Sequence, residues 1–441
     1  MSGQFYPYGS GNLLNERNTY FYSPYHGEPF LTEWKAARRR VLATEAVSGH
    51  VRREPTAALA QINGLATRLQ CGQTGGMAPD VRDSLDVLVQ RFEVTKRIYE
   101  DYADVWRAKD RTRFHDVSNY LAFGEVLTAA LRLSGGLTYL NALLKLNDTL
   151  SSLCGYLSTT ERARLSALFI AEDAAVNALR QRITTAVKEN AQQPPTLRPG
   201  PGRLEGVVLL AARSARSRAY LQAMVHFGLA PQAVVLLGDA EDGAGPVDGQ
   251  ARIWKGLMLA NPAETLEQTC NRAALPLINV PCLDVNAPEA VSALQELSPR
   301  IVVYSGVGGQ IVSPATLGIG ATFLHSHSGW LPDYRGSTTL YYSLLDNKPP
   351  GVSAILLDSG IDTGPVIARR RYPMPDADMD LDLVFDPGIR ADLMCRVLSD
   401  YAWTGFLTTE TKQTPTEGRA FFVIHPVLKH IARLSLEMKL T

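Results

Sequence analysis

A run of proline and glycine constrains the fold of this chain more than any other part of its sequence. The run is QQPPTLRPGPG, from Gln192 to Gly202, and it contains four prolines and two glycines. Proline lacks a backbone donor and glycine adds backbone freedom, so a helix is not expected to cross it. We expect a linker over residues 192–203. Because 441 residues are enough for two or three domains, we expect it to separate a domain over residues 1–191 from one that begins at residue 204.

The segment before this linker has helical periodicity. Leu85, Leu88 and Phe92 recur at the spacing of one helix face, and further apolar stripes run between residues 121 and 153. The tetrapeptide Ser158-Thr159-Thr160-Glu161 has the form of a capping box, which predicts that another helix begins there. The region before the linker is therefore expected to be a mainly α-helical accessory domain.

After the linker, short apolar runs alternate with helical segments, which is typical of a parallel α/β sheet. Residues 206–211 and 233–237 have the composition of buried strands, with a helix expected over 215–227, and a later strand is expected over 300–304. The predicted fold class is α/β, with a Rossmann-like, mostly parallel sheet over residues 204–410. Residues 411–441 are expected to form a C-terminal extension that packs on this second domain.

The charge balance and the cysteines exclude several classes of function. Lysine plus arginine and aspartate plus glutamate both number 44, so the chain has no overall positive field to hold a phosphate backbone. The five cysteines are scattered and form no C-x-x-C pair, which fits a reducing cytoplasm and argues against a zinc framework. The sequence shows neither a signal peptide nor a long apolar run. We expect a cytoplasmic protein with no nucleic-acid or membrane partner.

The residues that carry chemistry lie between positions 323 and 365. His325 and His327 alternate as on a strand, so both are expected to point to one side of it. That side is open to three interpretations: a metal site, an acid–base site, or a polar strand face. Two histidines at this spacing suit zinc, but no third ligand follows in a familiar pattern. A histidine with a later aspartate, Asp362, in a glycine-containing loop suits proton transfer better.

These motifs resemble the signature of the folate-dependent formyltransferase family. In that family an Asn-x-His motif precedes a loop of the type Ser-Leu-Leu-Pro-x-Tyr-Arg-Gly, and Asp-x-Gly follows. Here His327 matches the family histidine, the segment 331–336 (LPDYRG) matches the loop, and Asp362 with Gly364 matches the aspartate motif. The resemblance covers residues 204–430, about half of the chain. It is closer to the small-molecule and amino-sugar N-formyltransferases than to the tRNA-directed enzymes.

The resemblance implies transfer of a formyl group from 10-formyltetrahydrofolate to the amine of a small-molecule acceptor in a biosynthetic pathway, without a metal. It implies that His327 stabilises the oxyanion and relays a proton. Asp362 is expected to hold His327 or a water molecule and to accept the proton of the amine. His325 stands where the family has asparagine, and we expect it to serve as the second oxyanion donor in place of that amide.

The resemblance also implies two sets of binding residues. The folate is expected to contact two loops, at Gly308, Gly309, Gln310, Ile311, Asp358, Gly360 and Ile361. The acceptor is expected to contact Trp330, Tyr334, Arg335 and Gly336. Ser328-Gly329-Trp330 replaces the more common Pro-Ser-Leu of the family, which indicates a reshaped acceptor pocket.

Two further functions remain open from the sequence. One is a 10-formyltetrahydrofolate hydrolase, in which water takes the place of the amine. The other is a non-catalytic folate-binding or scaffold protein. Formylation of initiator tRNA is disfavoured, because only 30 residues follow Thr411 and the charge is balanced. The helical N-terminal domain is where we expect a homodimer contact or a partner protein.

Overall fold

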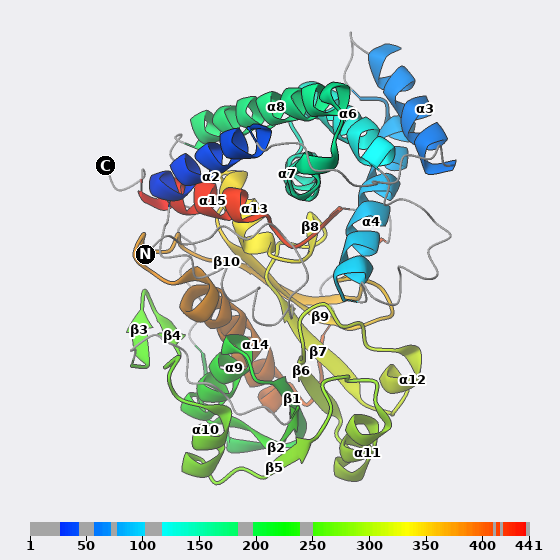
Figure 1. The fold of residues 1–441 in the computed structure, drawn as a ribbon. Helices are drawn as coiled ribbons and strands as arrows, with labels where there is room; N and C mark the ends of the chain where they lie inside the picture. The colour runs from blue at the N-terminus through cyan, green and yellow to red at the C-terminus, as the bar shows by residue number, and fades with distance from the viewer. Residues whose placement is uncertain are drawn as a thin grey trace. The chain divides into compact units, whose positions relative to one another are not determined.

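The computed structural model describes residues 27–43, 57–71, 77–101, 117–183, 197–238, 250–408, 412–414 and 418–437. The chain forms two compact units (Figure 1). The helical unit comprises Met1–Thr185 together with Ile424–Thr441, and the sheet unit comprises Ala186–Val423. No described helix combines the length and the apolar character needed to cross a bilayer.

Helices make up the described part of the helical unit. They are α2 (Gly27–Leu42), α3 (Ala57–Cys71), α4 (Pro79–Asp101), α6 (Val117–Ser134), α7 (Leu137–Ser152), the short 3-10 helix η1 (Cys154–Tyr156), α8 (Thr159–Ile183) and α15 (Pro426–Glu437). The expected capping box at the start of α8 is present, because the backbone N–H of Ser158 donates to the Glu161 carboxylate at 2.8 Å and the backbone N–H of Glu161 donates back to the Ser158 hydroxyl at 3.3 Å. Residues 137–147 of α7 are all buried, as expected for a helix at the centre of a bundle.

A buried polar network joins several elements of this unit. Arg38 of α2 forms ion pairs with Glu172 of α8 at 2.9 Å and with Asp148 of α7 at 2.8 Å. Asn147 donates to the same Glu172 carboxylate at 2.7 Å. His425, just before α15, contacts Asp148 at 2.6 Å. These contacts tie the last helix of the chain to the first helices.

The position of α15 corrects the expectation that residues 411–441 pack as one extension on the second domain. α15 packs against α2 and α8, and the ring of His430 stacks on Phe30 of α2 with 3.7 Å between ring centroids. Most residues of α15 are buried apolar side chains that need such a partner. The stretch before it stays in the sheet unit, where β11 (Arg419–Phe421) pairs with β8 (Tyr334–Gly336).

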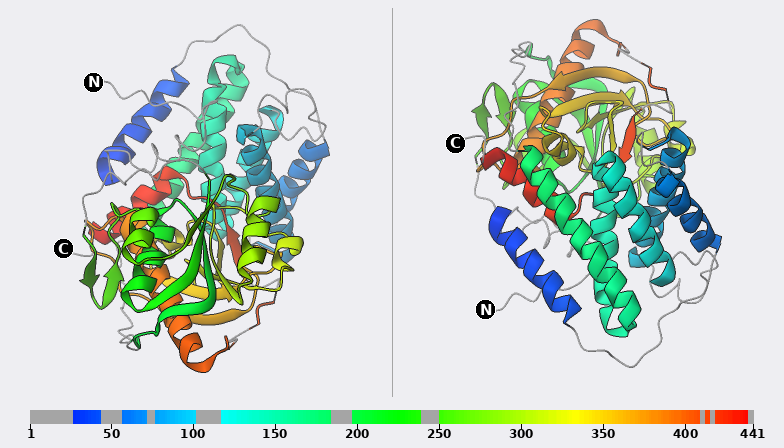
Figure 2. Two further views of the ribbon diagram at one scale, coloured as in Figure 1. Left: turned by 90° about the horizontal axis from the view of Figure 1, so that it is seen from below. Right: turned by 90° about the horizontal axis from the view of Figure 1, so that it is seen from above.

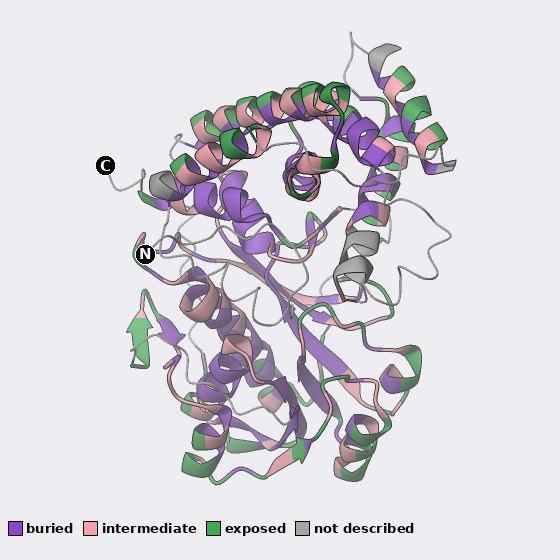
Figure 3. Cartoon of the chain, in the orientation of Figure 1, coloured by how far each residue is buried: buried purple, intermediate pink, exposed green. Residues whose placement is uncertain are grey.

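A seven-stranded sheet organises the sheet unit, as the alternating pattern predicted. Its order is β10 (Val366–Arg371), β9 (Gly351–Leu356), β7 (Thr322–His327), β6 (Ile301–Ser305), β1 (Gly202–Ala212), β2 (Leu229–Leu237) and β5 (Leu277–Val280). The strands from β7 to β5 are parallel, and β9 is antiparallel to both of its neighbours. The sheet is therefore mostly parallel, and its apolar strands are buried on both faces (Figure 3).

Helices cover both faces of this sheet (Figures 1 and 2). They are α9 (Ala215–His226), α10 (Leu266–Arg272), α11 (Pro288–Leu297), α12 (Pro314–Leu317), α13 (Thr339–Leu345), the π-helical turn η2 (Leu381–Phe385) and α14 (Asp386–Thr404). The strands β3 (Arg252–Trp254) and β4 (Leu257–Leu259) form a small antiparallel pair. α9 and α14 pack against each other, and α11 packs on β1, β2 and β5. The predicted α/β fold class is confirmed.

The end of the predicted linker belongs to the sheet unit. The backbone N–H of Gly200 donates to Phe227 at 2.9 Å, and that of Gly202 donates to Gly228 at 2.8 Å. β1 accordingly begins at Gly202, inside the predicted linker. Residues 192–196 lie outside the described residues.

Candidate active site

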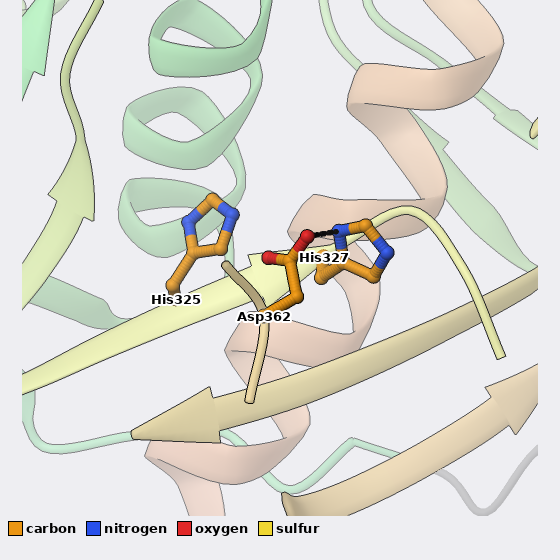
Figure 4. Close-up of side chains that lie close together, drawn as sticks. All are labelled: His325, His327 and Asp362. Carbon is orange, nitrogen blue, oxygen red and sulfur yellow. Dashed lines mark ion pairs between the residues drawn. The ribbon is translucent and has the colours of Figure 1, made fainter. Parts of the chain in front are cut away.

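His327 and Asp362 face each other at the end of β7 (Figure 4). His327 is the last residue of the strand, and its Nδ1 lies 3.4 Å from Oδ2 of Asp362. Its Nε2 lies 2.7 Å from the backbone carbonyl of Tyr334. A carbonyl oxygen only accepts, so Nε2 carries a proton and Nδ1 is the ring nitrogen that faces the carboxylate. The ring can therefore take up a proton on the side of Asp362.

The Asp362 loop is held in a strained but well-supported conformation. Asp362 has a φ of 54°, in the left-handed region that side-chain-bearing residues rarely adopt. Its Oδ2 accepts from the backbone N–H of Gly336 at 2.8 Å. The side chain of Asp358 accepts from the Gly360 N–H at 3.0 Å and from the Thr363 hydroxyl at 2.7 Å. These bonds fix the turn that points the Asp362 carboxylate at His327.

Gln413 braces the same loop from a distant part of the sequence. Its Nε2 donates to the carbonyls of Asp362 at 3.0 Å and Gly364 at 2.7 Å. Its Oε1 accepts from the Arg335 guanidinium at 3.1 Å. Sequence reasoning missed this residue because it lies beyond the predicted end of the sheet domain at residue 410, and no motif marks it.

Gly329 and Ser353 are two further site residues that the sequence did not identify. A Cβ atom at position 329 would collide with the Tyr334 carbonyl oxygen and with the His327 ring. Glycine at this position therefore permits the hydrogen bond between those two groups. The fully buried hydroxyl of Ser353 donates to the Gly329 carbonyl at 2.7 Å and accepts from the Leu331 N–H at 3.0 Å. The departure of Gly329 from the common family sequence was the only available signal.

His325 lies on the same side of β7 as His327, as the alternation predicted, with Asp362 between the two rings in Figure 4. Its side chain is buried, and its Nδ1 lies 3.2 Å from the backbone carbonyl of Tyr304. Burial holds the pKa of His325 well below its ordinary value, and the positive charges of Arg216 and Arg390 lower the pKa further. The imidazole is therefore neutral at physiological pH.

This arrangement runs against the expected role of His325 as an oxyanion donor. The one proton of the neutral ring sits on Nδ1, because only a donor can bond to the Tyr304 carbonyl. Nε2 then has a lone pair and no proton to donate. The family asparagine presents an N–H group, and this ring presents an acceptor.

Sequence reasoning missed Arg216 and Arg390, whose positive charges act on His325. Arg216 lies in the first turn of α9, donates to the Ser305 hydroxyl at 3.1 Å and also donates to the Gly306 carbonyl. Arg390 of α14 pairs with Asp386 at 2.8 Å. Burial lowers the pKa of Arg216, and the charge of Arg390 lowers it further. The signal was positional: Arg216 follows β1, the strand at which the parallel strand order reverses and where ligands commonly bind.

The predicted folate residues lie on two loops, after β6 and after β9. The side chain of Gln310 makes a hydrogen bond within the protein, in which its Nε2 donates to the Leu283 carbonyl at 2.8 Å. By contrast, Ile311 and Ile361 are about half exposed, at 50% and 49%. Each loop thus presents a large apolar side chain to solvent.

The predicted acceptor residues take different positions. The Tyr334 hydroxyl donates to Asp346 at 2.8 Å, and the buried Arg335 donates to Gln413 and to the Thr414 carbonyl. The side chains of Tyr334 and Arg335 therefore make hydrogen bonds that connect neighbouring segments of the site. Trp330 is partly exposed, and the guanidinium of Arg371 lies 4.2 Å from its ring centroid. The backbone N–H of Gly336 donates to the Asp362 carboxylate.

The same three side chains have the spacing of a possible cation site. One ring nitrogen each of His325 and His327 and a carboxylate oxygen of Asp362 lie within 4.8 Å of one another. Arg216 and Arg390 bring positive charge toward His325, and this charge opposes a divalent cation there. The arrangement favours acid–base chemistry, and the absence of a metal requirement stays a prediction.

The comparisons identify relatives over part of the chain. No family model matches it. A methionyl-tRNA formyltransferase of Finegoldia magna is 29% identical over 151 residues, which are 34% of this chain and 48% of that protein. The corresponding enzyme of Geobacter sulfurreducens is 32% identical over 99 residues, 22% of this chain and 31% of its own length. The chain thus spans about half, or less, of the curated relatives it matches.

Two solved structures are similar to part of this chain. A sugar N-formyltransferase from a Shewanella species is 18% identical, with a TM-score of 0.34, over 52% of this chain and 87% of that chain. A phosphoribosylglycinamide formyltransferase from Bacillus halodurans is 17% identical, with a TM-score of 0.33, over 47% of this chain and 100% of that chain. The sequence relatives confirm the resemblance to formyltransferases that the His327 and Asp362 motifs indicated.

Proposed function

From its relationship to the formyltransferases, we propose that this chain transfers a formyl group from 10-formyltetrahydrofolate to the amine of a small-molecule acceptor in a biosynthetic pathway. The observation that carries the proposal is the contact of His327 with Asp362, 3.4 Å apart, in the two motifs that match the family. Backbone groups of residues 334–336 orient both side chains. A cytoplasmic location and a homodimer or partner contact through the helical unit stay predictions.

The reaction requires a proton acceptor and a source of positive charge. The acceptor amine attacks the formyl carbon, the carbonyl oxygen becomes an oxyanion, and the amine nitrogen must lose a proton. Asp362 beside Nδ1 of His327 stabilises a protonated imidazole, as a carboxylate does for a histidine in other enzymes. That imidazolium stabilises the developing oxyanion electrostatically. The 3.4 Å separation is expected to shorten once the ring is charged.

The two folate-side loops and Trp330 would bind the reactants. The exposed Ile311 and Ile361 offer apolar surface for the aromatic parts of the folate, and the backbone groups of Gly308 and Gly309 lie in the same loop as Ile311. Trp330 is the one predicted acceptor residue whose side chain is both aromatic and partly exposed. It therefore carries the proposed acceptor contact, while Tyr334, Arg335 and Gly336 position the catalytic pair.

The test supplies the full chain with 10-formyltetrahydrofolate and single amines. The panel contains a dTDP-linked amino sugar, the proteinogenic amino acids and methionyl-tRNA, and one reaction contains no amine. Tetrahydrofolate release is followed by absorbance, and the formylated product by mass spectrometry. Formylation of one small amine, lost in Asp362→Asn, is the expected result. Formate release that is independent of amine indicates the hydrolase, and folate binding without turnover with any amine rejects catalysis.

A further inference from the structure

His325 offers the site a proton acceptor. Its Nδ1 is committed as a donor to the Tyr304 carbonyl at 3.2 Å. Among the described residues, none forms a hydrogen bond with its Nε2. The ring lies on the same side of β7 as His327, and Asp362 approaches between them (Figure 4). An imidazole nitrogen with a free lone pair beside the other two residues of the site is suited to take a proton from a ligand.

The surroundings explain why this nitrogen stays unprotonated before the reaction. Arg216 from α9 and Arg390 from α14 bring positive charge, and Asp386 pairs with Arg390 at 2.8 Å. Tyr304 of β6 contributes its carbonyl to Nδ1 and an aromatic ring whose centroid lies 5.8 Å from the imidazole. His327 on β7 and Asp362 are further titratable groups beside His325, and Nδ1 of His327 faces the Asp362 carboxylate. A proton gained at Nε2 is therefore held weakly and readily passed on.

We propose that Nε2 of His325 is the base that accepts the proton of the attacking amine and returns it to the departing tetrahydrofolate nitrogen. This inference rests on the proposed formyl transfer. The amine nitrogen forms its bond to the formyl carbon while the carbonyl pair moves to oxygen. The N–H proton then passes to Nε2. As the bond from carbon to the folate nitrogen breaks, the carbonyl re-forms and the imidazolium protonates that nitrogen, so His325 ends the cycle neutral.

This role differs from that of an amide at the same position. An asparagine side chain can donate to an oxyanion, but its oxygen is a very weak base and cannot hold the proton between the two steps. If His325 replaced the family amide as a donor, His325→Asn would keep activity. If His325 instead accepts the proton and returns it, which we call the shuttle role, His325→Asn and His325→Ala both lose activity to the same extent.

The kinetic experiment compares His325→Asn, His325→Ala and the matched control His226→Asn, which places the same substitution at the exposed end of α9. Formyl transfer to the acceptor found in the panel is measured as kcat/KM. Both His325 variants are expected to fall by about a hundredfold or more, the order for removal of a general base. His226→Asn is expected to match the wild type. A His325→Asn variant within about tenfold of the wild type overturns the proposal in favour of a donor role.

A second measurement does not depend on catalysis. Nitrogen NMR of the full chain labelled with 15N-histidine reports which ring nitrogen is protonated, with His325→Asn used to assign the signal. The Nδ1–H tautomer is expected, with no titration near pH 7. An Nε2–H tautomer overturns the proposal even if transfer is observed. If the tautomer is as expected but the wild type formylates none of the amines, the proposed function fails and the shuttle role fails with it.

Discussion

Gly329 lies directly against the imidazole ring of His327, so a methyl group in place of the glycine hydrogen would overlap that ring. We expect Gly329→Ala to displace Nε2 from the Tyr334 carbonyl and to reduce kcat/KM by about ten- to a hundredfold, because a misplaced acid–base group loses most of its effect. Gly64→Ala is the control, since a Cβ there meets nothing within 4 Å. Unchanged kinetics in Gly329→Ala would show that the hydrogen bond to Tyr334 does not orient the ring.

Asp362 and His327 are expected to act as one unit. Asp362→Asn and His327→Ala should each lower kcat/KM by about a hundredfold or more, and the double variant should lose little beyond either single change. Steady-state kinetics of the three variants provide the measurement. Near wild-type rates for both single variants would remove the basis of the proposed function.

Gln413 is expected to support the Asp362 loop without touching a substrate. Gln413→Glu keeps the size of the side chain but replaces the donor that bonds Asp362 and Gly364 with a carboxylate. We expect kcat to fall by roughly tenfold with little change in KM for the folate, because the strained loop relaxes. Gln295→Ala on the exposed side of α11 is the control. A variant that changes KM alone would assign Gln413 to ligand binding.

The buried Glu172 makes the stability of the helical unit depend on pH. Burial raises its pKa to about 7 from an ordinary value of 4.5, although Arg38 opposes the shift. The folded state thus binds a proton more tightly than the unfolded state. Its contribution is full below about pH 4.5 and is lost as the pH rises through about 7.

The corresponding measurement is thermal unfolding of the wild type and Glu172→Gln between pH 4.5 and 8. We expect the wild type to lose on the order of 2 kcal/mol relative to the variant over this range. Taking the difference removes the opposite contribution of His425, whose pKa is lowered by burial. A difference that is flat with pH contradicts a raised pKa for Glu172.

The boundaries of the sheet unit predict which fragment folds alone. A fragment of residues 197–423 keeps the Gly200 and Gly202 backbone bonds and ends before α15. We expect it to unfold cooperatively. A fragment of residues 204–441 cuts into β1 and carries the apolar α15 without α2 and α8, so it is expected to aggregate. Equal behaviour of the two in calorimetry and size-exclusion chromatography contradicts this division.

The sequence predicted those parts of the fold that depend on local patterns. The capping box at Ser158 and Glu161 and the alternation of His325 and His327 involve neighbouring residues, and both are present in the structure. The position of α15 depends on contacts with α2, nearly four hundred residues away, so its apolar face alone did not identify its partner. Which ring nitrogen of His325 carries the proton depends on the backbone carbonyl of Tyr304 in β6. Every residue has a backbone carbonyl, so a sequence motif could not indicate this contact.

The return of the chain to the helical unit has a consequence for synthesis. α15 is made after the whole sheet unit, yet it packs against α2, which is made near the beginning. On the ribosome, the sheet unit can therefore reach its native state while the earlier helices still lack one side of their core. The helices synthesised first must wait for α15, and a nascent chain stalled before residue 426 would expose the apolar surface that α15 normally covers.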